Sequence, residues 1–154
     1  TNTWNNTAAS STVVTLGNNA NNNRVDDNDQ YIMYSFAEKQ GYSKFGSYVG
    51  NGNADGTFVY TGFKPAWVMT KPSSATGDWY MHDNKRDGYN PQNDYLKANA
   101  TDAESNDDDR IDLLSNGFKF RTTHSSQNGS GVTYIYMAFG QSIVGSNNVP
   151  ATAR

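Results

Sequence analysis

Aromatic and polar side chains interleave along residues 78–91 (DWYMHDNKRDGYNP), a pattern typical of sugar-binding surfaces. Aromatic rings stack on the apolar faces of sugars, and charged or amide groups form hydrogen bonds with the hydroxyls. The candidate ligand-binding residues are Trp79, Tyr80, His82, Arg86 and Tyr89. An alternative interpretation places Trp79 and Met81 in the core, because alternate strand residues share a face. Arg86 would then pair with Asp83 or Asp87.

Residues 51–56 (NGNADG) resemble the first half of a calcium-binding loop. Asn51, Asn53 and Asp55 alternate there before a glycine, and Ca²⁺ takes oxygen ligands at such spacing. The bidentate Glu that completes these loops is replaced by Gly62. One carboxylate would bind Ca²⁺ only weakly, so we expect an ordinary hairpin loop, with a weak calcium site as the alternative and no other cofactor.

Two acidic stretches, VDDND (25–29) and SNDDDR (105–110), concentrate the negative charge. Two such loops, or three copies around a trimer axis, could surround a hard cation. Charge runs are more often solvated loops that discourage pairing at sheet edges. We therefore expect solvated loops.

The sequence contains no pattern that indicates catalysis. His82 and Asp83 are adjacent, so their side chains point to opposite faces of a strand. The chain has no Cys and only two His, which excludes disulfides, thiolate nucleophiles and three-histidine zinc sites. A nucleophilic serine motif is also missing from the sequence. Two of the fifteen acidic residues could form a glycosidase pair, but no spacing points to one, and we expect no enzyme activity.

The composition predicts a folded β-protein. The 154 residues carry a net charge of −3 and include 10 Tyr, 7 Phe and 3 Trp, bulky side chains that can build a core. Lys and Arg are scattered, which argues against a nucleic-acid partner. No apolar run approaches the ~20 residues of a membrane span, so we expect no membrane insertion.

Short apolar runs separated by Gly, Asn, Pro and Ser clusters indicate an all-β fold. The predicted strands are residues 13–16, 31–37, 42–49, 57–62, 66–71, 78–82, 118–122 and 132–139. Their regular spacing predicts an antiparallel β-sandwich, jelly-roll-like, with long polar loops. Residues 94–115 have the only helix-friendly composition, and we expect one helical turn there. The core candidates are Tyr34, Phe36, Phe58, Trp67, Met69, Trp79, Phe118, Ile135, Met137 and Phe139.

A weak internal repeat relates the two ends of the chain. Residues 14–17, a polar loop and residues 31–37 parallel residues 118–121, a polar loop and residues 134–140. Three identities support the alignment: Tyr31 with Tyr134, Ile32 with Ile135 and Phe36 with Phe139. We interpret this as duplication of a long-looped hairpin, with residues 31–37 as a central strand.

Residues 41–91 and 133–154 resemble a repeat module found near the carboxyl ends of tail-fibre and other virion structural proteins of marine bacteriophages. The landmarks are YSKFGSYVGNG, FVYTGFKPAWVM, WYMHDNKRD, SNGFKFR and YIYMAF. A module in that family begins just after the preceding module's last strand, which residues 31–38 resemble. The resemblance implies that residues 1–38 end a preceding repeat, packed into the same fold, and that residues 39–154 form a complete β-sandwich module with an extended tail.

The resemblance also bears on the ends of the chain. Phe139 is followed by Gly140 and Gln141, where the family usually continues FAE. The closing VGSNNVPATAR resembles the family's usual terminus, which implies that Arg154 is the natural C-terminus and that Thr1 is a boundary. Because WYMHDNKRD is a landmark, whereas receptor-contact loops usually differ between phage modules, the resemblance favours the core interpretation of residues 78–91.

The function implied by the resemblance is a non-enzymatic virion structural module in a tail fibre or related appendage, with a host-surface glycan as ligand. Its location would be the virion, after assembly in the host cytoplasm. Its partners would be other virion proteins and copies of itself, as a homo-oligomer with a trimer favoured. The tail, residues 143–154, would form part of that interface. The alternatives are a capsid decoration or purely architectural virion protein, and a carbohydrate-binding module of a bacterial enzyme.

Overall fold

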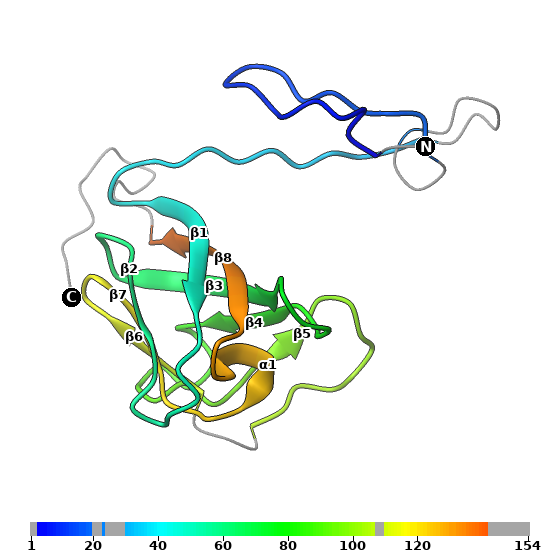
Figure 1. The fold of residues 1–154 in the computed structure, drawn as a ribbon. Helices are drawn as coiled ribbons and strands as arrows, with labels where there is room; N and C mark the ends of the chain where they lie inside the picture. The colour runs from blue at the N-terminus through cyan, green and yellow to red at the C-terminus, as the bar shows by residue number, and fades with distance from the viewer. Residues whose placement is uncertain (1–2, 20–22, 24–29, 107–109, 142–154) are drawn as a thin grey trace. The chain divides into compact units, whose positions relative to one another are not determined.

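The structure of the chain is a computed structural model that describes residues 3–19, 23, 30–106 and 110–141. Its strands are β1 (Ser43–Val49), β2 (Phe58–Tyr60), β3 (Pro65–Pro72), β4 (Tyr80–Asp83), β5 (Leu96–Lys97), β6 (Ile111–Leu114), β7 (Gly117–Phe120) and β8 (Thr133–Gly140), with one short helix, α1 (Ser125–Asn128) (Figure 1). The six strands predicted between residues 42 and 82 and between 118 and 139 are confirmed as β1–β4, β7 and β8.

Two antiparallel sheets form the sandwich, so the predicted all-β fold is confirmed. In the described ranges, one sheet has five strands in the order β1-β8-β3-β4-β5, and the other has three in the order β2-β7-β6. The first strand therefore pairs with the last, and β2 pairs with β7. This nesting of early strands with late strands is typical of a jelly roll.

The core lies between the two sheets and is mainly aromatic. The five-stranded sheet contributes Tyr48, Val68, Tyr134, Tyr136 and Ala138, and the three-stranded sheet contributes Val59, Ile111, Leu113, Phe118 and Phe120. The ring of Tyr48 is stacked near Phe120 and Tyr134, with centroid distances of 5.0 and 4.9 Å. Stacked aromatic rings thus supply the apolar contacts that the few Leu, Ile and Val residues cannot.

The predicted core was largely assigned to the wrong faces of the strands. Of the ten candidates, only Phe118 is buried. Phe58 and Ile135 are exposed, and Trp67, Met69, Trp79, Met137 and Phe139 are half-buried. In β8, Tyr134, Tyr136 and Ala138 face the core, while Ile135, Met137 and Phe139 lie on the other face. Alternation identifies two faces but not which one a second sheet covers when both are apolar.

The chain divides into two units, Thr1–Phe36 and Ala37–Arg154. The predicted strands at 13–16 and 31–37 are wrong, because neither segment forms a strand. Ile32 and Tyr34 are 81% and 78% exposed, and Phe36 is also exposed, so the core assignments of Tyr34 and Phe36 are wrong as well. A strand exists only beside a hydrogen-bonded neighbour, and no described strand pairs with residues 31–37. The packing of residues 1–38 into the same fold stays a prediction.

Two further expectations, a hairpin of β7 with β8 and a helical turn within residues 94–115, are wrong. β7 and β8, which were interpreted as a long-looped hairpin, lie in different sheets. Residues 94–115 contain β5 and β6 instead of a helical turn, and Ile111 and Leu113 alternate with less buried neighbours as in a one-sided strand. The helical turn occurs at α1, where Nδ1 of His124 accepts a hydrogen bond from the Ser126 amide at 3.1 Å. Side-chain capping of this kind starts a helix.

Candidate functional site

The five predicted ligand-binding residues do not form one surface. Tyr80 and His82 are 6% and 0% exposed and belong to the buried face of β4. Trp79 is half-buried on the opposite face, where Nζ of Lys71 lies 5.8 Å from its ring centroid. Tyr89 is 72% exposed, in the following loop. The interpretation of Trp79 and Met81 as core residues is equally wrong, because the inward face of β4 is that of Tyr80 and His82.

Arg86 organises the loop after β4 as an ion-pair centre. Its Nε lies 2.7 Å from Oδ2 of Asp83, and its guanidinium also contacts the Glu104 carboxylate. The predicted pairing of Arg86 with Asp83 is confirmed. Burial raises the pKa of Asp83, but hydrogen bonds from the Lys85 amide and Arg86 outweigh it and lower the pKa overall. The guanidinium of Arg86 thus forms ion pairs with carboxylates of the chain itself.

His82 belongs to a buried polar network. Its Nδ1 lies 3.3 Å from the Asp94 carbonyl oxygen, and its Nε2 lies 2.7 Å from Nε2 of Gln127. These contacts fit a neutral imidazole that donates from Nδ1 and accepts at Nε2. Burial lowers the pKa of His82 to about 4. His82 was predicted to bind a ligand at the surface. Its uncharged ring instead forms hydrogen bonds in the interior and supports the fold.

The candidate calcium loop is held together by its own hydrogen bonds. Oδ1 of Asn51 accepts from the Asn53 amide at 3.0 Å, and Oδ1 of Asn53 accepts from the Asp55 amide at 2.8 Å. Asp55 pairs with Nζ of Lys119 at 2.7 Å, which lowers the pKa of Asp55. The loop is not a hairpin, because it joins β1 to β2 in the other sheet. Its side-chain oxygens are turned to these partners instead of converging on a cation position.

The acidic residues Asp26, Asp27, Asp29 and Asp107–Asp109 lie outside the described residues, as does the tail 143–154. Within the described ranges, no group of three or more His, Cys, Asp or Glu side chains has the geometry to hold a metal ion. The same residues include no helix of the length and apolar character needed to cross a membrane.

A polar pocket of about 480 Å³ lies between the turn before β1 and the end of β2. It is lined by Glu38, Lys39, Gln40, Gly41, Ser43, Lys44, Tyr60, Thr61 and Gly62. Lys39 and Ser43 close the turn through reciprocal backbone hydrogen bonds of 3.1 and 2.9 Å. On the opposite wall, the amides of Thr61 and Gly62 both donate to the Asn116 carbonyl. Both walls are therefore fixed by backbone hydrogen bonds.

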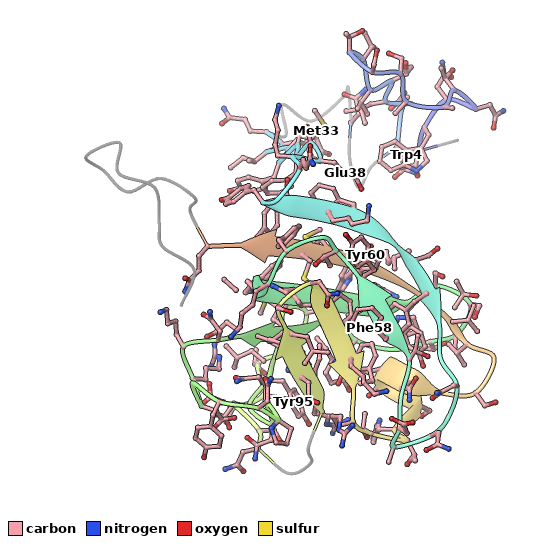
Figure 2. All side chains as sticks on the ribbon, turned by 90° about the vertical axis from the view of Figure 1, so that its left-hand side faces the viewer. Trp4, Met33, Glu38, Phe58, Tyr60 and Tyr95 are labelled. Carbon is pink, nitrogen blue, oxygen red and sulfur yellow. The ribbon has the colours of Figure 1, made fainter. Side chains whose placement is uncertain are left out.

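The pocket combines one aromatic plane with both signs of charge. Tyr60 is 62% exposed, and Glu38, Lys39 and Lys44 supply the charges. Figure 2 labels Tyr60 and Glu38. Gly62 has φ +83°, which a residue with a side chain adopts only with strain, and this turn brings the chain back beside Tyr60. Sequence reasoning missed this site. Its signal is the charged run EKQGYSK (38–44), which meets Tyr60 only through the order of the strands.

A second cavity belongs to the N-terminal unit and has a different character. Its volume is about 660 Å³, and it is lined by Trp4, Asn6, Thr7, Ala8, Ala9, Val14, Thr15, Met33, Tyr34 and Ser35. The lining is mostly apolar and has no charged side chain. It therefore lacks the charged donors and acceptors of the pocket at Tyr60.

A family model described as a domain of unknown function (DUF7483) matches residues 1–142. The chain belongs to the DUF7483 family. The match includes the N-terminal unit and all strands from β1 to β8, so it begins well before residue 39, where the phage-module resemblance places a boundary. No curated protein and no solved structure matches the chain.

Proposed function

We propose that this DUF7483 chain is a non-enzymatic structural module of a bacteriophage virion, in a tail fibre or related appendage, that binds a bacterial surface glycan. The likeness of its strand sequences to phage virion modules supports the virion role. The pocket at Tyr60 carries the binding role, because it combines polar and charged walls with an exposed aromatic ring.

The chemistry of the pocket suits a polar ligand. The Tyr60 ring offers an apolar plane for stacking against one face of a sugar. The ammonium groups of Lys39 and Lys44 donate hydrogen bonds, and the Glu38 carboxylate accepts them. The hydroxyls of a sugar need both donors and acceptors. Because the pocket has two cations, Lys39 and Lys44, and one anion, Glu38, it favours a glycan that carries carboxylates.

The rigidity of the walls supports this assignment. Oγ of Ser43 donates to the Ala37 carbonyl at 2.8 Å and accepts from the Lys39 amide at 3.0 Å, which fixes the chain at the pocket floor. Oγ1 of Thr61 donates to the Phe63 carbonyl at 2.6 Å on the other wall. A site that is ordered before the ligand arrives avoids part of the entropy cost of binding.

The test compares two exposed tyrosines. We expect Tyr60→Ala to reduce binding of the chain to purified surface polysaccharides of marine bacteria by about five- to tenfold, since loss of one stacking ring costs about 1–1.5 kcal/mol. Tyr89→Ala is the matched control, because Tyr89 is equally exposed but lies outside the pocket. Loss of binding with Tyr89→Ala alone would move the site to residues 78–91. Absence of binding to any polysaccharide in the wild-type chain would refute the receptor role.

A further inference from the structure

The outward face of the five-stranded sheet carries an unbroken apolar row. The register aligns Phe45 with Met137, Met137 with Met69, Met69 with Met81, and Met81 with Leu96. The row therefore crosses every strand of the sheet, and each member is half-buried on the face opposite the core.

The rows on either side of the methionines are also largely apolar but end in opposite charges. One flanking row contains Phe139, Trp67 and Asp83, and the other contains Ile135, Lys71 and Trp79. Asp83 and Lys71 thus lie at opposite ends of the strands, on either side of the central row. Asp83 shares the guanidinium of Arg86 with Glu104, so two carboxylates and one cation leave a net negative charge at that end. The face therefore has an apolar centre, a net negative charge at one end and the Lys71 ammonium at the other.

A face of this composition is typical of a protein interface. With strands ~4.8 Å apart and same-face residues ~6.8 Å apart, three rows across the sheet cover roughly 400 Å². Apolar patches of this size on a monomer are often functional. Met and Trp are enriched in interface cores, whereas Lys and Glu are depleted. A glycan is a poor ligand for the central row, because thioether and aliphatic groups offer it no strong hydrogen bonds.

Two of the four edge strands, β1 and β6, are less suitable for self-association. At the outer edge of β1, Oε1 of Glu38 accepts from the Phe45 amide at 3.1 Å. At the outer edge of β6, the Asn90 side chain accepts from the Leu113 amide at 2.9 Å and donates to its carbonyl at 3.1 Å. Side chains that occupy edge groups in this way block strand addition. A contact between copies is therefore expected at the face.

We propose that this methionine-centred face docks on the same face of a second copy of the chain, related by a two-fold axis along the methionine row. This symmetry places methionine against methionine. It also exchanges the flanking rows, so that Asp83 faces Trp79 and Lys71 of the second copy and opposite charges meet. Two-fold contacts are self-complementary in this manner. The proposal goes beyond the proposed function and does not depend on glycan binding.

The expected contact is weak and depends on concentration. A footprint of roughly 400 Å² per copy lies below the ~800 Å² of a standard interface. We expect a dimer dissociation constant in the range of about 1–100 μM, as for other small, transient interfaces.

Sedimentation velocity of the full chain, from about 1 to 300 μM, tests this. The wild type should shift from monomer to dimer, and Met69→Glu should weaken the dimer at least about 100-fold, because it buries a charge at the centre of the contact. Phe58→Glu is the matched control, since Phe58 is an exposed aromatic residue of the other sheet and its change should leave the dimer intact. A monomer at every concentration, a trimer, or a dimer unaffected by Met69→Glu would each overturn the proposal.

The lack of cysteine in the chain allows a second readout that does not depend on affinity. Met69→Cys should be cross-linked to a dimer by a short bis-maleimide, because the two-fold axis brings both copies of this position together. Phe58→Cys should give only background cross-linking. Equal yields from both variants would contradict the two-fold arrangement. Neither experiment involves polysaccharide, so this proposal and the glycan-binding proposal fail separately.

Discussion

The carboxylate of Glu38 accepts a hydrogen bond from the main-chain amide of Phe45, with 3.1 Å between Oε1 and N. One side chain thereby occupies an outward-facing donor on the edge strand β1 and supplies the negative charge of the pocket at Tyr60. Its charge also contributes, after burial, to the raised pKa of Tyr136 in the adjacent strand. The edge of the sandwich and the proposed glycan site are therefore coupled through Glu38.

Replacing Glu38 by Ala should weaken both features. We expect Glu38→Ala to lower the free energy of unfolding by about 1 kcal/mol, because the Phe45 amide loses a charged partner at an exposed edge. Urea denaturation measures this change, with Lys64→Ala as an exposed control. An unchanged denaturation midpoint would show that water replaces the carboxylate at no cost.

His82 should make the stability of the fold depend on pH below neutrality. Burial lowers its pKa from 6.5 to about 4, so between these values the unfolded chain binds the proton more readily than the folded chain. The contribution of His82 to the free energy of unfolding is therefore fully present above about pH 6.5. It is lost as the pH falls toward 4, by roughly 3 kcal/mol in total.

The measurement for His82 is the free energy of unfolding at pH 7 and at pH 4.5 in the wild type and in His82→Leu. The variant should be less stable than the wild type at pH 7, because Gln127 loses a partner, and its stability should fall less between pH 7 and pH 4.5. Identical pH dependence in both proteins would mean that His82 does not titrate as described.

Asn128 should be the most sensitive polar position of the fold. Its side chain is fully buried, and its Nδ2 lies 2.8–2.9 Å from three acceptors, Oδ1 of Asn51 and the carbonyl oxygens of Asn53 and Thr122, which share its two hydrogens. Asn128→Asp would place a carboxylate against these acceptors and should destabilise the fold by roughly 3 kcal/mol or more. Ser130→Asp, two residues further on at the surface, should change stability by less than about 0.5 kcal/mol. Thermal unfolding compares the two, and similar losses would contradict this role for Asn128.

The sequence predicted the sandwich because its strands are marked by alternating aromatic residues and bounded by turn residues. It did not predict the face, since β8 has Tyr134 and Tyr136 on one side and Ile135, Met137 and Phe139 on the other. Hydrophobicity ranks the second set higher, yet the second sheet covers the tyrosines. Only the long-range pairing of the sheets, which no local pattern encodes, decides between the faces.

The candidate site was missed for the same reason. Residues 38–44 and Tyr60 are far apart in sequence and become neighbours only through the nesting of the strands. In residues 78–91, aromatic and polar groups are adjacent in sequence, which predicts a binding surface. Alternation along the strand instead places Tyr80 and His82 in the core and Trp79 on the opposite face. The Arg86–Asp83 pair could be predicted because it is local, three residues apart.

The central claim, that the chain is a module of a virion appendage, is tested most directly by locating it in intact particles. Gold-labelled antibodies raised against the full chain should label the tail fibres of purified phage particles in electron micrographs. Labelling confined to the capsid shell, or a chain missing from purified particles, would contradict the claim.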